Sequence, residues 1–283
     1  MATVACCITA AVLAGHVTPR SSPTLRVRVL RLVDRSRLAH FRNGTSGPRV
    51  LATTVRYPAG SRRPLPLVVF AHGFALTPET YEPLLDAWAS AGYVVAAPLF
   101  PVEGSSAPGG PSQADLVNEP GDLRFVVSRL TAPTSPLRGI VDASRVAVAG
   151  HSDGAEAALS AAFDPRFRDR RIRAAVIMSG AALPGFAGAP AGSPPLLAVQ
   201  GTSDSINQPG TTSAYYRLMR RPKFLLWLLG ASHLPPYSTA DRWSSVVDRA
   251  TVAFLDRYLR RGSIRPLVTA GTHSSLARIV SDP

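Results

Sequence analysis

Residues 145–162 read RVAVAGHSDGAEAALSAA, and this stretch decides the fold prediction. At its centre, Gly150-His151-Ser152-Asp153-Gly154 forms a G-x-S-x-G pattern. The apolar run before it predicts a strand, and the alanine-rich run after it predicts a helix. A serine between strand and helix, with glycine two residues away on each side, indicates a sharp, strained turn where the two backbones approach closely. Ser152 is therefore the candidate nucleophile.

A serine hydroxyl is a weak nucleophile without a neighbouring base, so one of the six histidines should serve it. Where this motif carries a catalytic triad, the chain order is serine, acid, histidine, which leaves His233 and His273. His151 adjoins the serine and is expected to point away from it. His233 follows the apolar run 224–229, a predicted buried strand, whereas His273 follows no strand. The sequence therefore favours His233 as the general base.

The acid of the triad should follow a strand between the serine and the histidine. Residues 194–200 predict such a strand, and Asp204 comes directly after it. Asp164 and Asp169 are the alternatives, but they lie in a charged run that precedes the next strand. Asp204 is thus the candidate acid, although an aspartate there could also stabilise a turn or cap a helix.

Two backbone N–H groups should stabilise the oxyanion of an acyl-transfer reaction. In this arrangement one comes from the loop after an early central strand, and the other from the residue after the nucleophile. Residues 65–71 predict that strand, and His72-Gly73-Phe74 follow it. The predicted donors are the N–H groups of Phe74 and Asp153. The Asp153 carboxylate suits a helix N-terminus and is expected to point away from the substrate.

The rest of the chain alternates between strand and helix patterns. Residues 25–34 and 49–57 predict an antiparallel entry pair, and the remaining elements alternate as βα units. Their predicted strands are 65–71, 93–99, 145–149, 174–179, 196–200 and 224–229, and their predicted helices lie near 80–91, 115–130, 154–162, 211–219 and 240–260. This pattern predicts an α/β fold: a mostly parallel central sheet of about eight strands with helices on both faces. Only a short Gly/Pro/Ala segment separates strands 174–179 and 196–200, so no large lid insertion is expected.

Several segments between about residues 33 and 260 resemble the α/β-hydrolase superfamily. The resemblance is to the branch of chlorophyllases, platelet-activating-factor acetylhydrolases, dienelactone-hydrolase-like proteins and cutinase-like polyester hydrolases. It is carried by the segments VDRSR (33–37), TVRYP (54–58), HGF (72–74), GTSDSI (201–206) and GASH (230–233). It implies a serine carboxylic ester hydrolase that works through an acyl-enzyme without a cofactor. The missing lid insertion predicts a shallow, exposed site and therefore short to medium acyl esters as substrates. The resemblance also implies substrate contacts at Phe74, His151, Phe186 and Ile206.

The chain departs from polyester hydrolases at three places. Those enzymes carry Trp or His before the serine, and His151 fits this pattern. They carry Met after the serine, where this chain has Asp153. Their substrate-stacking Trp has no counterpart near residues 179–186, and their C-terminal disulfide has none either, since the cysteines are Cys6 and Cys7. Polyester cleavage is therefore the alternative prediction rather than the first one. A non-catalytic binding protein of the same fold is a further alternative, although such proteins usually lack a triad member.

Composition narrows the remaining possibilities. A chain of 283 residues, 46% hydrophobic and 17% charged, can bury one large core and is not disordered. No apolar run reaches the roughly 18–20 residues of a membrane span. The net charge of +13 comes almost entirely from scattered arginines, without a nucleic-acid-binding motif, so nucleic acid is not an expected partner. No cluster has metal-ligand spacing, and we expect a monomer that acts on a small-molecule or polymeric ester.

The two ends of the chain are expected to lie outside the catalytic domain. Residues 1–22 predict a signal peptide or a disordered N-terminus. Their apolar segment 2–14 has a suitable length, but no Lys or Arg precedes Arg20. Secretion is slightly favoured over a cytoplasmic location. Residues 23–262 form the expected catalytic domain, and 263–283 form the expected C-terminal tail.

Overall fold

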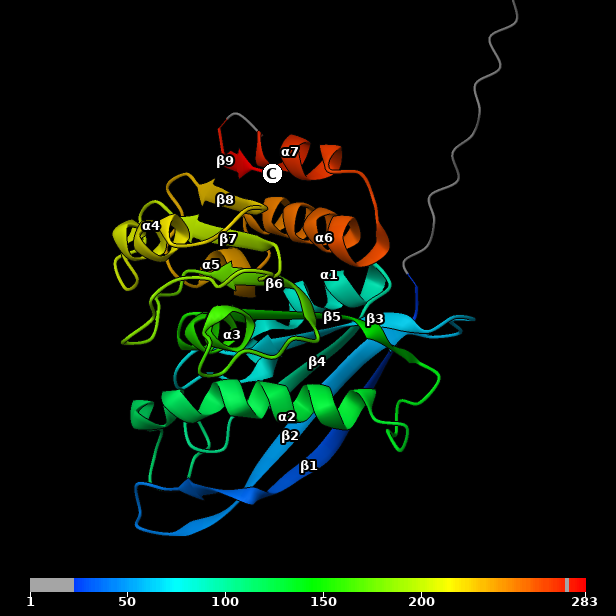
Figure 1. The fold of residues 1–283 in the computed structure, drawn as a ribbon, viewed down its shortest axis with the longest axis vertical. Helices are drawn as coiled ribbons and strands as arrows, with labels where there is room; N and C mark the ends of the chain where they lie inside the picture. Colours follow the sequence, from blue (N-terminus) through cyan, green and yellow to red (C-terminus); the bar gives the residue numbers. More distant parts are fainter. Residues whose placement is uncertain (1–22, 273–274) are drawn as a thin grey trace, which may run out of the picture.

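A nine-stranded sheet organises residues 23–272 and 275–283, the part of the chain that the computed structural model describes (Figure 1). The strand order is β1-β2-β4-β3-β5-β6-β7-β8-β9. The strands are β1 (Leu25–His40), β2 (Ser46–Pro58), β3 (Leu65–Ala71), β4 (Val94–Leu99), β5 (Val141–His151), β6 (Ile172–Met178), β7 (Leu196–Gly201), β8 (Lys223–Leu228) and β9 (Ala277–Asp282). The six strands from β4 to β8 in this order are parallel, and β1, β2 and β9 pair antiparallel. The prediction of a mostly parallel sheet is confirmed.

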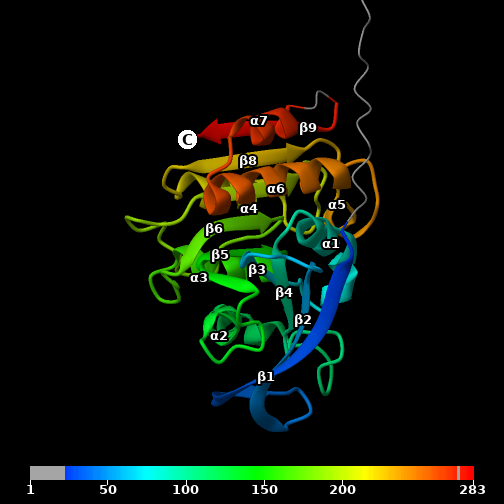
Figure 2. The ribbon, with the colours of Figure 1, turned by 90° about the vertical axis from the view of Figure 1, so that its right-hand side faces the viewer.

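Helices cover both faces of this sheet, as the alternating pattern predicts. They are η1 (Pro78–Tyr81), α1 (Glu82–Ser90), η2 (Gln113–Asn118), α2 (Glu119–Thr131), α3 (Asp153–Phe163), α4 (Pro209–Arg217), α5 (Pro235–Ser238), α6 (Ser244–Arg260) and α7 (Arg265–Gly271). One buried cluster joins α2, α3 and α4 to the sheet, and a second joins α1, α5, α6 and α7 to its other face. Figure 2 shows the strong twist that turns β1 away from the direction of β8.

The central strands are buried on both faces, which explains their continuous apolar sequences. All residues of β3 after Leu65 are buried, as are all six residues of β7. Helix α3 packs directly on this centre because its Ala-rich sequence allows the backbones to come close, and only Glu156 is not fully buried along it. The predicted helix 115–130 is divided into η2 and α2, because Pro120 has no N–H to continue a helix from the preceding turn.

The C-terminal segment differs from the expected tail. Helix α7 packs Leu267 and Ala270 into the second core cluster, and β9 pairs antiparallel with β8 from Leu228↔Ala277 to Lys223↔Asp282. Strand β9 thereby covers the backbone edge that β8 would otherwise expose. The segment 277–282 (ARIVSD) is short and half-exposed, so it lacks the apolar run that marks the central strands. The sheet therefore has nine strands instead of about eight, and it continues beyond residue 262.

The loop between β6 and β7 leaves the sheet open where lids are inserted in related folds. Residues 179–195 contain no helix or strand, and the structure describes all of them. No helix within the described ranges is long and apolar enough to cross a membrane. The expected N-terminal segment 1–22, with Cys6 and Cys7, lies outside the described residues, as does His273.

Candidate active site

Ser152 lies at a strained turn between β5 and α3. Its backbone has φ +56° and ψ −126°, a region that residues with a Cβ rarely adopt. A Cβ on Gly150 would lie 2.1 Å from the carbonyl oxygen of Gly154, and a Cβ on Gly154 would lie 2.3 Å from that of Ala71. Glycine is therefore required at both positions. The turn holds the serine hydroxyl at the C-terminal edge of the sheet.

Ser152, His233 and Asp204 form a continuous hydrogen-bonded chain. The Nε2 atom of His233 lies 3.0 Å from Oγ of Ser152, and its Nδ1 atom lies 2.8 Å from Oδ2 of Asp204. Because the carboxylate only accepts, Nδ1 carries the proton and Nε2 is free to accept from the serine. His233 comes from the loop between β8 and α5, and Asp204 from the loop after β7. The structure thus brings the three predicted residues together.

Asp204 is held by its own loop as well as by the histidine. Its Oδ1 atom accepts the backbone N–H groups of Ile206 at 2.9 Å and Asn207 at 3.0 Å. Its Oδ2 atom accepts a longer bond, 3.2 Å, from Nε2 of Gln200. Only 3% of Asp204 is exposed, so four donors satisfy a carboxylate that water scarcely reaches.

The two predicted oxyanion donors lie on either side of the serine. A Cβ on Gly73 would lie 3.0 Å from Cβ of Ser152, so the loop that carries Phe74 packs directly against the nucleophile. Asp153 begins α3, where the first N–H groups have no partner within the helix. Across the described residues, the backbone N–H of Phe74 donates to no protein acceptor. The Asp153 side chain accepts from Nε2 of Gln113 at 2.7 Å.

His151 does not offer a substrate-binding surface, which corrects the expectation from the resemblance. The side chain is fully buried, and both ring nitrogens have protein partners. Burial, with a smaller contribution from the neighbouring His233, lowers the pKa of His151 to about 3. Neither ring nitrogen bonds to Ser152, although the ring centroid lies 4.6 Å from that of His233.

The other three predicted substrate contacts occupy different positions. Phe74 and Ile206 are exposed, with 39% and 69% of their surfaces accessible. Phe186 is half-buried and lines a hollow of about 340 Å³ with Tyr215 and Leu218. None of the three candidate triad residues lines that hollow. Ile206 lies two residues after Asp204, and Phe74 follows Gly73, which packs against Ser152, whereas Phe186 belongs to the lid-free loop.

The two alternative acids take no part in this chain. Asp164 and Asp169 are almost fully buried, and each is bonded to an arginine two residues later, Arg166 and Arg171. These contacts hold the pKa of both carboxyls below the usual range, although burial alone would raise it. Within the described ranges, no group of three or more His, Cys, Asp or Glu side chains is placed to hold a metal ion.

A buried carboxyl pair supports the loop beside the oxyanion donors. Glu103 and Glu119 are fully buried, and no N–H or O–H of the other described residues donates to their four carboxyl oxygens. The backbone carbonyl of Glu103 accepts the N–H of Ala75 at 3.0 Å, next to Phe74. Burial raises the pKa of Glu103 to about 8, and burial and Glu103 hold that of Glu119 well above the usual range. The pair is therefore protonated at neutral pH.

The protonated Glu103 should make stability depend on pH. The folded chain keeps this proton up to a pKa of about 8, whereas an unfolded chain loses it near 4.5. The contribution of Glu103 to the free energy of unfolding is therefore fully present below pH 4.5 and is lost as pH rises through 8. Glu103→Gln, a neutral replacement, should lower the slope of Tm against pH across this window. Exposed Glu79→Gln should follow the wild type, and equal slopes in all three proteins would contradict the protonated pair.

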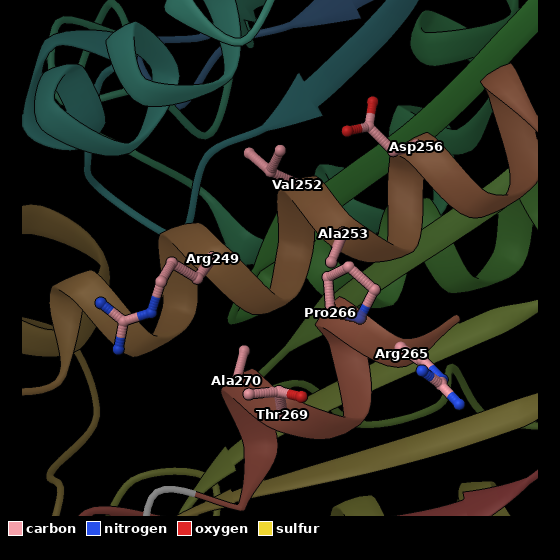
Figure 3. A pocket seen from close by; sticks show the side chains of 8 residues that line it. All are labelled: Arg249, Val252, Ala253, Asp256, Arg265, Pro266, Thr269 and Ala270. Carbon is pink, nitrogen blue, oxygen red and sulfur yellow. The ribbon is translucent and has the colours of Figure 1, made fainter. Parts of the chain in front are cut away.

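A hollow of about 750 Å³ lies between α6 and α7 (Figure 3). Its walls combine small apolar side chains with charged ones at the rim: Arg249, Val252, Ala253, Asp256, Arg265, Pro266, Thr269 and Ala270. In Figure 3 the side chains of Arg249 and Arg265 extend away from each other. No residue of the ester site lines this hollow, so it carries no part of the chemistry described above.

Sequence reasoning missed the residues that support the site from behind. Tyr81 contacts both His151 and Gly73, Gln113 donates to Asp153, and Gln200 donates to Asp204. Only Gln200 carried a usable signal, because it ends the strand four residues before the acid. Tyr81 lies in the predicted helix near 80–91 and Gln113 just before the next one, and only the folded chain brings them to the site.

Comparisons with known proteins agree with this geometry. A family model described as PET hydrolase-like matches residues 34–266, most of the chain. The solved structure of a ferulic acid esterase from Streptomyces cinnamoneus is similar, with 25% identity and a TM-score of 0.70 over 87% of this chain and 93% of that one. No curated protein matches the sequence. The chain therefore belongs to the PET hydrolase-like family of α/β-hydrolases, and it is a serine carboxylic ester hydrolase.

Proposed function

We propose that this enzyme cleaves its ester through an acyl-enzyme on Ser152, with His233 as general base and Asp204 as the acid that orients it. The observation that carries the proposal is the unbroken chain Ser152 Oγ, His233 Nε2 and Nδ1, Asp204 Oδ2, with separations of 3.0 and 2.8 Å. A base within this distance can accept the hydroxyl proton as the oxygen attacks.

In the first half of the reaction, Oγ of Ser152 attacks the ester carbonyl and its proton passes to Nε2 of His233. Asp204 stabilises the imidazolium that forms. The N–H groups of Phe74 and Asp153 bind the oxyanion, and the C–O bond breaks as His233 gives its proton to the leaving alcohol. A water molecule, deprotonated by His233, then releases the acid and restores the serine. Every group in these steps comes from a single chain between residues 23 and 283, so the proposal requires neither a cofactor nor a second subunit.

The proposed substrates are short to medium acyl esters. Loop 179–195 forms no lid helix, so a bound ester lies at an open edge of the sheet. The exposed side chains of Phe74 and Ile206 are the apolar contacts that the site offers there. Each additional CH₂ adds about 0.8 kcal/mol only where protein buries it, and an open site stops burying the chain after a few carbons.

A series of p-nitrophenyl esters from C2 to C16 tests this range. We expect kcat/KM to peak at short or medium chains, because longer acyl groups extend into water without further gain. We also expect the rate to follow monomeric substrate smoothly through the solubility limit, since no lid has to open. A maximum at C12 or beyond, or a jump in rate when an emulsion forms, would contradict the open site.

A polyester is the second candidate substrate, favoured by the family description and by the same open edge. The net charge of +13 would assist adsorption to a film that bears carboxylate chain ends. The test is release of soluble acid from a polyester film, compared with Ser152→Ala at equal surface coverage. Release by both proteins alike would show that the film is not cleaved at this site.

A further inference from the structure

His151, the residue before the candidate nucleophile, lies at the centre of a buried aromatic group. Its ring centroid is 4.6 Å from that of His233, 4.9 Å from that of Tyr237 and 5.5 Å from that of Tyr81. Tyr81, Tyr237 and His151 are almost completely inaccessible to solvent. A polar side chain at this depth has to be satisfied by the protein, so its hydrogen bonds are informative.

The direction of each hydrogen bond follows from its partners. The carbonyl oxygen of His233 can only accept, so Nε2 of His151 donates to it across 3.0 Å. In the neutral ring Nδ1 then accepts, and Oη of Tyr81 donates to it across 2.8 Å. The same Oη atom accepts the backbone N–H of Gly73 at 3.1 Å. One relay therefore runs from Gly73 through Tyr81 and His151 to the main chain of His233.

The relay joins the three loops on which the proposed chemistry depends. Gly73 precedes the oxyanion donor Phe74, and His151 precedes Ser152. The relay holds His233 by its main-chain carbonyl, not by the imidazole that contacts the serine. The hydrogen bond that holds this loop therefore does not use either ring nitrogen of His233, whose protonation changes during the reaction.

The relay requires His151 to stay neutral. Protonated His151 would carry a second positive charge 4.6 Å, between ring centroids, from the imidazolium that His233 becomes during the reaction. It would also lose the acceptor that Tyr81 uses. Complete burial prevents this, since desolvation opposes the charged form of the ring.

We propose that Tyr81 and His151 are positioning residues that hold the histidine loop and the oxyanion loop in register around Ser152. The inference rests on the proposed function, because it assigns the relay to the same triad. Neither residue reaches the surface, so their contribution should appear in kcat and leave substrate binding unchanged.

Tyr81→Phe is the sharpest test, because it removes one oxygen atom and keeps the ring packing. The N–H of Gly73 and Nδ1 of His151 then lose their partner. We expect kcat to fall about 10- to 100-fold, the cost of a small displacement of reacting groups, with KM within about twofold of the wild type. Labelling of Ser152 by a fluorophosphonate should slow in parallel, since it needs the same base.

The matched control is Tyr93→Phe. Tyr93 is also fully buried, and its hydroxyl donates to Oδ1 of Asp256 at 2.5 Å, remote from the relay. Thermal unfolding should show a loss of stability in both variants, but only Tyr81→Phe should lose kcat. A wild-type kcat in Tyr81→Phe, or a change confined to KM, would overturn the proposal.

A second variant shows whether the relay acts as one unit. His151→Phe removes both nitrogens, and the double variant with Tyr81→Phe should lose no more kcat than the worse single variant. Losses that multiply would contradict a relay.

The reaction of the wild-type protein with a fluorophosphonate separates the two proposals. Absence of a Ser152 adduct in that reaction refutes the triad. A normal adduct rate in both wild type and Tyr81→Phe refutes only the relay.

Discussion

Ser152→Ala is expected to lower kcat for a p-nitrophenyl ester by about 10⁵- to 10⁶-fold, the largest effect of any single change. The variant lacks the oxygen that attacks the carbonyl, while the glycines at positions 150 and 154 still shape the turn. Alanine keeps the Cβ, so the backbone strain at φ +56° is unchanged, and Tm should stay close to that of the wild type. Stopped assays at high enzyme concentration measure the residual rate.

The matched control for this change is Ser160→Ala in α3. That hydroxyl is buried, and it has no hydrogen-bond partner among the described residues. Its removal should leave kcat within about twofold of the wild type, because the side chain touches no group of the proposed chemistry. An Ser152→Ala protein that kept wild-type activity would show that another residue attacks the ester.

Asp204→Asn is expected to lower kcat by about 10⁴-fold. Two backbone N–H groups point at the Oδ1 position, so the amide oxygen of asparagine should occupy it. The NH₂ group then faces Nδ1 of His233 and donates to it. This leaves the imidazole proton on Nε2, where it can no longer accept from Ser152.

The two other aspartates between the serine and the histidine provide the comparison. In Asp164→Asn and Asp169→Asn, a buried carboxylate loses its charge and its ion pair with an exposed arginine, Arg166 or Arg171, so both changes should lower Tm. Their kcat should remain close to that of the wild type. If either of them lost activity as strongly as Asp204→Asn, the acid would have been assigned to the wrong loop.

Most of the fold can be predicted from the sequence, because the strongest signals in the sequence are local. The apolar runs 65–71 and 196–200 belong to strands buried on both faces, and such strands need continuous apolar sequence. The glycines around Ser152 are required because a Cβ at either position would lie 2.1 or 2.3 Å from a backbone carbonyl oxygen. Where a residue type is imposed by its own neighbours in this way, the pattern identifies the element.

The remaining features depend on contacts between distant segments, and no local pattern reports them. Strand β9 is short and half-exposed, and it exists because β8 offers an unpaired edge. The burial of His151 depends on Tyr81, which is 70 residues away in the chain. A histidine beside a nucleophile can face the substrate or the core, and only the position of that tyrosine decides between them.

Labelling of the active site with a fluorophosphonate tests the central claim, acyl-enzyme formation on Ser152, most directly. The wild-type protein is reacted with a fluorophosphonate, digested, and analysed by peptide mass spectrometry while residual esterase activity is followed. The account predicts one adduct per chain, on the peptide that contains Ser152, formed in proportion to the loss of activity and strongly slowed in His233→Ala. An adduct on another residue, or complete inactivation with Ser152 unmodified, would contradict it.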